Sequence, residues 1–280
     1  MSEEVIIIIR HKKGRKRLLK RSLDSVKNQT YENISLSVLC MDFSKNDLKD
    51  NSYLSELNLD FSSLINIEDL LCFLQKSHAK FLCFLDDDDS WAPEYISRLI
   101  SVLIKTNNKY SQVNAISCHS NKVNEICEGN RIIINDTQPW NHYIPTGPID
   151  FDLLYYINSI PLSSCVFFKK IAVDLLYNHN VNSPVFFWPF IIDFLSKYDL
   201  WVINEPLSFY HFRENLDYEF GNYSIINNEI LEIDYTLKLR SLMRNNSNSL
   251  LLNSLLYKII NKNIHHKLSY IEDKIKGMVK

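Results

Sequence analysis

Residues 80–85, Lys-Phe-Leu-Cys-Phe-Leu, lead directly into four consecutive aspartates, Asp86-Asp87-Asp88-Asp89, and this stretch decides the fold. The apolar run is typical of a strand buried in a parallel sheet, and it ends abruptly at the carboxylates. In open α/β sheets, ligands bind at the carboxyl ends of the strands. The stretch therefore predicts a cluster of negative charge at a binding edge.

Two interpretations of the acidic run remain open from the residues alone. Like charges this close repel, so the run is stable only if water, protonation or a cation neutralises it. Oxygen ligands on a short loop suit Mg²⁺ or Mn²⁺ bridging substrate phosphates, and alternate residues such as Asp86 and Asp88 can then point into one pocket. The other interpretation is an exposed acidic turn that also caps the helix expected from Pro93 onward.

Strands and helices alternate around this stretch. Buried strands are expected at residues 5–9, 35–40 and 80–85, and helices at residues 18–26, within 55–76 and from Pro93 onward. This order predicts an α/β fold with a doubly wound sheet flanked by helices. Further along, strand-like pieces are expected at residues 113–118 and 131–135, helical or buried segments at 150–176 and 185–197, and a helical pattern from 224 onward.

The composition of the 280-residue chain excludes several classes of protein. Only five residues are glycine, and neither a dinucleotide fingerprint nor a Gly-rich phosphate-binding loop is present. A formal net charge of −2 gives no reason to expect a nucleic-acid partner. No apolar run reaches the roughly 20 residues of a membrane span, and the first residues lack the basic region of a secretory signal. The six cysteines include no CxxC pair, which favours a reduced, cytoplasmic protein.

The segment FLDDDDSWAPE, residues 84–94, resembles the FLDDDDxWxPE signature of family 2 glycosyltransferases with the GT-A fold. Residues 7–12 and 18–31 are similar to the opening strand, loop and helix of that family, and the helix reads LLKRSLDSVKNQTY. Residues 163–170 look like the family's segment on the acceptor side, and residues 194–213 resemble the block that ends here in EPLSFYHFR. The likeness is spread over residues 5 to about 215.

This resemblance implies a GT-A mixed sheet flanked by helices and a metal-dependent glycosyltransferase. Such an enzyme moves a sugar from a nucleotide-diphosphate donor to a saccharide or lipid-linked acceptor, with inversion, in the synthesis of a bacterial-type surface polysaccharide or O-antigen. The implied cofactor is Mn²⁺ or Mg²⁺, which as a Lewis acid neutralises the leaving diphosphate. Asp88 and His211 match the positions expected to approach this metal.

The resemblance also implies residues that bind the donor. Asp86 and Asp88 fill the D-x-D positions and are the expected catalytic pair, with Asp86 toward the ribose, and Asp87 belongs to the same nucleotide-sugar site. Asp42 matches an acidic residue that bonds the nucleobase or ribose, and Arg10 matches a residue against base or phosphate.

Two of these residues have plainer interpretations. Arg10 beside Lys12 and Lys13 is alternatively a solvated cation. His211, which follows Phe-Tyr, is alternatively a histidine satisfied in the core or at its edge.

The chain departs from the family pattern where the catalytic base is expected. Inverting transfer needs a carboxylate to take the proton of the acceptor hydroxyl. The family carries its carboxylates before the late helix, but here Phe187 and Pro189 stand at those positions. Asp193 is the nearest acid and a weak candidate, because a helix would turn it toward another side. The general base is therefore unassigned.

The expected organisation has two parts. Residues 1–220 form a GT-A glycosyltransferase-like domain, with a nucleotide-binding half at about 1–105 and an acceptor half at about 106–220, and residues 221–280 form a C-terminal helical extension. In the extension, a heptad-like stripe is formed by Ile264, Leu268, Ile271 and Ile275, which follow one another at 4-3-4 spacing. Packing on its own domain, a homodimer, and peripheral contact with the inner face of the membrane are all left open for this stripe.

Three functions are compatible with these features. The first is the glycosyltransferase. The second is a catalytically degenerate GT-A domain that binds a nucleotide sugar or acts as a partner subunit, which the replacement of carboxylates by Phe187 and Pro189 favours. The third is a nucleotidyltransferase or phosphoesterase that uses the same acidic loop.

Overall fold

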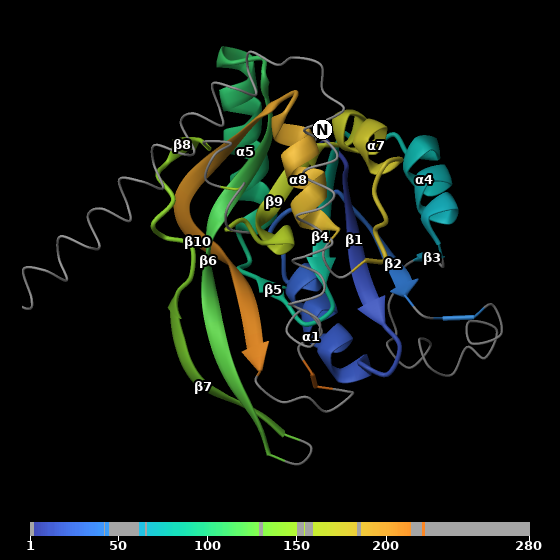
Figure 1. Ribbon diagram of the computed structural model, residues 1–280, viewed down its shortest axis with the longest axis vertical. Helices are drawn as coiled ribbons and strands as arrows, with labels where there is room; N and C mark the ends of the chain where they lie inside the picture. The colour runs from blue at the N-terminus through green and yellow to red at the C-terminus, as the bar shows by residue number, and fades with distance from the viewer. Residues whose placement is uncertain are drawn as a thin grey trace, which may run out of the picture. The chain divides into compact units, whose positions relative to one another are not determined.

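The computed structural model describes residues 3–41, 43–44, 62–64, 66–128, 131–149, 154, 159–183, 186–213 and 220–221 (Figure 1). All of these lie in the first of the two units into which the chain divides, Met1–Asn227. The predicted donor residue Asp42 lies outside the described residues, as does nearly all of the predicted extension, residues 222–280.

The first part of the sheet is parallel and alternates with helices. Its elements are β1 (Val5–Lys12), α1 (Lys16–Lys27), β2 (Ile34–Met41), β3 (Ser62–Leu64), α4 (Ile67–Lys76) and β4 (Phe81–Asp86). β1 pairs with β2 and β4, and β2 pairs with β3, all in parallel. The strands predicted at 5–9, 35–40 and 80–85 are thus confirmed, and α4 lies within the span 55–76 in which a helix was expected.

The second part of the sheet is mixed. It comprises β5 (Ser90–Trp91), α5 (Tyr95–Lys109), β6 (Val113–Glu128), β7 (Arg131–Pro139), β8 (Gly147–Pro148), the 3-10 turn η1 (Leu162–Ser164), β9 (Cys165–Phe168), α7 (Lys169–Leu176), α8 (Phe187–Leu195) and β10 (Asp199–Arg213). The strand order is β3-β2-β1-β4-β9-β6-β10-β5, with β7 beside β6 and β8 beside β10.

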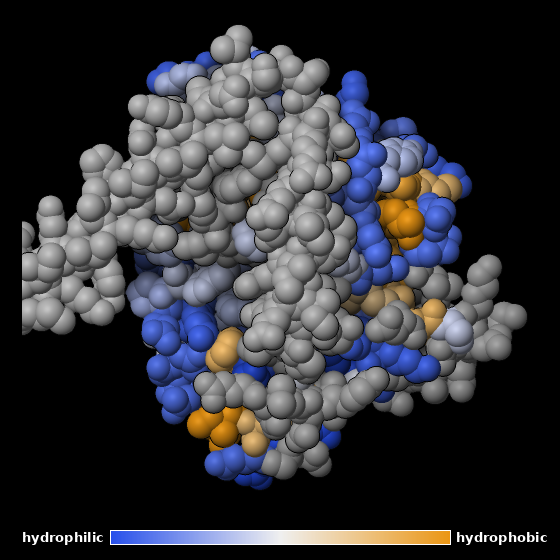
Figure 2. Space-filling view, viewed as in Figure 1, coloured by the Kyte–Doolittle hydropathy of each residue, from blue (hydrophilic) through white to orange (hydrophobic). Residues whose placement is uncertain are grey.

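Two segments are now defined more closely. Within the segment 150–176, expected to be helical or buried, residues 165–168 form the buried strand β9, antiparallel between β4 and β6. The strand predicted at 113–118 continues to Glu128 and pairs in parallel with β10. β6 and β7 form a hairpin that extends well beyond the helices (Figure 1). Its Ile126, Ile133 and Ile134 are exposed, and Figure 2 shows a small hydrophobic patch among hydrophilic residues in the region of this hairpin.

Burial on both faces explains the continuous apolar run of β1. Its Ile6 and Ile8 pack with residues of α4, α7 and α8, whereas Val5, Ile7 and Ile9 pack with residues of α1 and α5. Helices thus cover both sides of the central sheet, and a strand between them has no solvent face that would require polar residues. The carboxyl ends of β1 and β4 coincide, since Arg10 pairs with Asp86 in the register.

Candidate functional site

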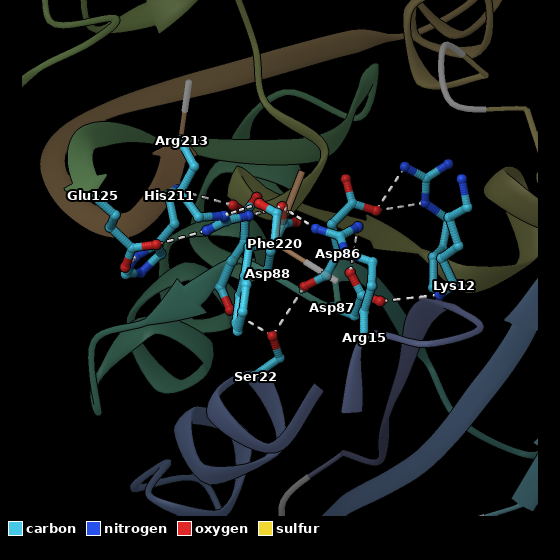
Figure 3. Close-up of polar contacts among 12 residues, drawn as sticks. Lys12, Arg15, Ser22, Asp86, Asp87, Asp88, Glu125, His211, Arg213 and Phe220 are labelled. Carbon is cyan, nitrogen blue, oxygen red and sulfur yellow. Dashed lines mark hydrogen bonds and ion pairs between the residues drawn. The ribbon is translucent and has the colours of Figure 1, made fainter. Parts of the chain in front are cut away.

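The acidic run forms a turn at the carboxyl end of β4. The Asp89 amide donates to the Asp86 carbonyl at 3.1 Å, and the Asp87 amide donates to the Arg10 carbonyl at 3.1 Å. The hydroxyl of Ser22, on α1, donates to the carbonyls of Asp86 and Asp89 at 3.1 and 2.7 Å. Figure 3 shows the side chains that diverge from this turn toward different partners.

Asp86 pairs with Arg10. The Arg10 Nε and Nη2 atoms lie 2.7 and 2.6 Å from Asp86 Oδ1. Arg10 Nη1 also donates to the carbonyls of Val181 and Ser183 at 3.3 and 3.1 Å, and its guanidinium lies 4.7 Å from the ring centre of Phe186. Arg10 is 5% exposed, so it joins the acidic turn to the segment before α8 and is not a solvated cation.

Asp87 is bonded inside the loop that follows β1. Its Oδ2 accepts from His11 Nδ1 at 2.8 Å and from the Lys12 amide at 3.0 Å. Its Oδ1 lies 2.9 Å from Arg15 Nη1. These contacts attach the basic segment 10–17 to the acidic turn.

Asp88 is held by two arginines. Arg15 Nη2 and Arg213 Nη2 lie 2.5 and 2.6 Å from its Oδ2, and Arg21 donates to its backbone carbonyl. Burial alone would raise the pKa of Asp88, but the charges of Arg15, Arg213 and Arg21 lower it well below its usual range. Asp88 is therefore ionised and already paired with cations.

Asp89 accepts from two neutral donors. The Ser163 hydroxyl lies 2.8 Å from Oδ2, and the His211 amide lies 3.2 Å from Oδ1. Burial and the charges of Asp88 and Asp86 raise the pKa of Asp89 well above its usual value. This carboxyl group therefore favours its neutral form far more than Asp88 does.

Glu125, on β6, completes the site and was missed from the sequence. It lies 2.6 Å from Arg213 Nη1 and 2.5 Å from Arg21 Nη1, and His211 Nδ1 lies 2.7 Å from its Oε1 (Figure 3). Burial would raise the pKa of Glu125, but the His211 bond and Arg21 lower it to about 2. Arg15, Arg21 and Arg213 were missed as well.

The four aspartates differ in their access to solvent. The side chain of Asp86 is 31% exposed, against 1% for Asp87 and 11% for Asp88, and Asp89 is 3% exposed. A dissolved ligand can therefore reach the carboxylate of Asp86 most easily. The inner three aspartates serve mainly to hold the turn against its neighbours.

His211 uses both ring nitrogens within the protein. Nδ1 faces Glu125, and Nε2 lies 2.8 Å from Ser90 Oγ. Burial lowers the pKa of His211, and a neutral ring that donates from Nδ1 accepts the Ser90 hydroxyl at Nε2. The residue is 6% exposed, as the plainer interpretation of a satisfied histidine predicts.

The predicted metal ligands do not fit a metal in this arrangement. A chain of contacts runs from His211 through Glu125 and Arg213 to Asp88, so that a guanidinium lies between the two predicted ligands in this network. The described part of the chain contains no group of three or more His, Cys, Asp or Glu side chains that could hold a metal ion.

The segment expected to supply the base is apolar. Phe187 is 5% exposed and packs in the core against Phe167, with their ring centres 6.3 Å apart. Asp193, on α8, lies 3.3 Å from both His179 Nε2 and Lys197 Nζ. The structure thus brings Arg10 and Asp86–Asp88 together and leaves Asp193 in a separate ion pair.

Comparisons with known structures show the fold of this chain. The segment 1–349 of S. aureus TarS, in complex with UDP-GlcNAc, matches with a TM-score of 0.58 at 13% identity, over 94% of this chain and 73% of that chain. A longer S. aureus TarS structure matches with a TM-score of 0.53 at 12% identity, and this chain spans only 43% of its length. These likenesses show a GT-A glycosyltransferase fold, as the sequence resemblance predicts.

A less similar structure and the sequence comparisons show nothing further about the fold of this chain. A mannosyltransferase from Pyrobaculum calidifontis, PcManGT, in complex with GDP-Man and Mn²⁺, has a TM-score of 0.46 at 11% identity, over 75% of this chain and 57% of that chain, which supports no argument about this chain. No family model and no curated protein matches the sequence. Within the described residues, no helix is long and apolar enough to cross a membrane.

Proposed function

We propose that this chain is a glycosyltransferase that binds a nucleotide-diphosphate sugar at the carboxyl edge of β1 and β4. The observation that carries the proposal is the position of Asp86, at this edge of a GT-A sheet, with a side chain 31% exposed. The three following aspartates are buried in internal contacts. The similar TarS structure in complex with UDP-GlcNAc supports a donor of this class.

Different residues of the site bind different parts of the donor. Asp86 accepts hydrogen bonds from hydroxyl groups of the donor, and Arg10 is a positioning residue that holds the carboxylate by two contacts on Oδ1. The segment after β1 carries the exposed cations Lys13 and Arg17, and the bond from the Lys12 amide to Asp87 attaches this segment to the turn. These cations are suited to a diphosphate, because exposed basic groups attract anions.

Finer features of the reaction follow only from the sequence resemblance. They are inversion at the anomeric carbon, a saccharide or lipid-linked acceptor in surface polysaccharide synthesis, and a peripheral location at the inner face of the membrane. A divalent cofactor belongs to the same set, although the side chains around Asp88 do not fit one. The base that takes the acceptor proton is unassigned.

Donor binding tests the proposal directly. UDP-GlcNAc, other UDP-sugars, GDP-sugars and dTDP-sugars would be titrated calorimetrically into wild type, Asp86→Asn and Asp24→Asn. Asp24 forms an exposed pair with Lys20 and serves as the matched control. We expect Asp86→Asn to weaken the best donor by at least about tenfold, since a charged hydrogen bond contributes about 1.5–3 kcal/mol, whereas Asp24→Asn leaves the affinity unchanged. If no donor binds to the wild type, the proposal is wrong.

A binding protein without transfer activity is the second candidate. It is favoured by the apolar packing of Phe187 and by the ion pair that engages Asp193. Donor hydrolysis and transfer to oligosaccharide acceptors would be followed after binding is established. Turnover supports the enzyme, and donor binding without turnover across donors and acceptors supports the binding protein.

A further inference from the structure

Among the described residues, four carboxylates of the site are paired with four arginines of the same chain. The pairs join Arg10 with Asp86, Arg15 with Asp87 and Asp88, Arg21 with Glu125, and Arg213 with Asp88 and Glu125. Asp89 is the additional acid, and it accepts two hydrogen bonds from neutral donors.

These arginines come from distant parts of the chain. Arg10, Arg15 and Arg21 lie on β1, the following loop and α1, whereas Arg213 ends β10, 125 positions after Asp88. Arg213 is 0% exposed and Arg15 is 6% exposed. Cations buried this completely stay only where carboxylates compensate them. The pairing is therefore a built part of the fold and not a surface contact.

The arrangement around Asp88 differs from that of a carboxylate in a metal site without its cation. Such a carboxylate lies among other acids and repels them until a cation binds. Here two guanidinium groups contact Oδ2 of Asp88 at 2.5 and 2.6 Å, and the histidine predicted as the second ligand is bonded to Glu125 and Ser90. The positive charge that a divalent ion would bring is already present.

We propose that Arg15 and Arg213 replace the divalent cation at Asp88, so that the acidic turn is stable without a metal and the chain holds no divalent ion there. A consequence that rests on the proposed function is that the nucleotide-diphosphate sugar binds in the absence of metal. The exposed Asp86, and not Asp88, then provides the carboxylate that faces the donor.

The sign of one stability change tests the proposal without any ligand. The melting temperature of the full chain would be measured in EDTA for wild type, Asp88→Asn and the control Asp24→Asn. If Asp88 is paired with arginines, Asp88→Asn leaves buried cations uncompensated and lowers the melting temperature by about 5 °C or more. If Asp88 instead belongs to a repelling metal site, the neutral asparagine raises the melting temperature, and the proposal is overturned.

Binding of manganese to the wild-type chain gives a second measurement, with Asp88→Asn as its control. Mn²⁺ would be added to the wild-type chain, with its binding followed by electron paramagnetic resonance and the melting temperature recorded in parallel. We expect no bound Mn²⁺ and no shift, because an ion that binds only the folded state would raise the melting temperature by several degrees at about 100 times its Kd. Binding of Mn²⁺ that Asp88→Asn abolishes would overturn the proposal.

Arg15→Gln covers the case in which Asp88→Asn does not fold. This variant removes one partner of Asp88 and leaves all the carboxylates in place, and we expect a lower melting temperature in EDTA. An unchanged or raised melting temperature would contradict the role given to Arg15.

A donor titration separates this inference from the proposed function. The best donor would be titrated into wild type in EDTA and in Mn²⁺, and we expect dissociation constants within about twofold of each other. Binding only in Mn²⁺ overturns the metal-free site but supports the glycosyltransferase. Absence of donor binding in both conditions refutes the proposed function, and the melting and Mn²⁺ measurements still decide the inference.

Discussion

Asp86 and Asp88 are two residues apart in one acidic turn, and they form different kinds of ion pair. Asp86 pairs with Arg10 at the rim, where its side chain is 31% exposed, whereas Asp88 pairs with Arg15 and Arg213 at 11% exposure. Water reaches the carboxylate of the outer pair, Arg10 with Asp86. The charge of Asp88 in the inner group is compensated mainly by the buried Arg15 and Arg213. Neighbouring carboxylates of one turn therefore differ both in their access to solvent and in the cations that compensate them.

Arg213→Ala is expected to have the largest effect, because it breaks the inner pair. It would leave Asp88 and Glu125 without a shared partner in the interior, which costs about 3–5 kcal/mol in the free energy of unfolding. Urea unfolding followed by circular dichroism measures this cost. Arg98→Ala, at the exposed pair with Glu205, is a matched control and should cost less than about 1 kcal/mol. Equal costs for the two variants would remove the distinction between inner and outer pairs.

Acid is expected to have the second largest effect, because it protonates Glu125 in the inner network that joins Asp88, Glu125, Arg21 and Arg213. The pKa of Glu125 is lowered to about 2 in the folded chain, below the value of about 4.3 for an unperturbed glutamate. A lowered pKa contributes stability that is present above pH of about 4.3 and is lost as pH falls toward 2. We therefore expect the free energy of unfolding to fall over this window.

Glu125→Gln isolates this contribution from those of the other acids. The variant should be less stable than wild type at pH 6, and the difference should shrink as the pH approaches 2. Urea unfolding of both proteins at several pH values measures it. A difference independent of pH would show that Glu125 does not contribute through its charge.

Arg10→Ala is expected to have an intermediate effect at the outer pair. The variant loses the contacts with Asp86 and the bonds to the carbonyls of Val181 and Ser183, at a cost of about 1–2 kcal/mol in stability. Because Asp86 also loses its orientation, donor affinity should fall. Partial recovery of affinity in Arg10→Lys would support a positioning role, and unchanged affinity in Arg10→Ala would exclude it.

Asp86→Asn should have the smallest effect on stability. Its carboxylate is 31% exposed, and Arg10 keeps its bonds to the carbonyls of Val181 and Ser183, so the free energy of unfolding should fall by less than in Arg10→Ala. The donor affinity should nevertheless fall more in Asp86→Asn than in Arg10→Ala or Arg10→Lys. A large loss of stability would place Asp86 with the inner group and would remove the basis for its contact with the donor.

Local patterns predicted the parallel part of the fold. The β-branched and apolar runs of β1 and β4 indicated strands buried on both faces, and the aspartates after β4 indicated a polar edge. The resemblance of residues 84–94 to the glycosyltransferase signature predicted the GT-A fold, which the TarS likeness supports. In these segments, the residues that determine the structure are close neighbours in the sequence.

The inner network could not be predicted in the same way. Glu125 and Arg213 are single charged residues on polar strands, and their pairing depends on the register that places Arg213 opposite Glu125. The alternation that places Val123 and Glu125 on one buried face of β6 is visible only in the folded strand. The strand predicted at 113–118 ends before both residues.

The order of the parallel strands and helices, and the dense acidic group at their carboxyl edge, follow from local residue patterns. How that charge is neutralised depends on contacts that form only when the chain folds. The ion pairs of Asp88 join it to residues 73 and 125 positions away in the chain. Such pairs depend on strand register and burial, and neither leaves a local pattern in the sequence. For this reason, four aspartates that suggest a metal site can form, in the folded chain, a turn compensated by arginines.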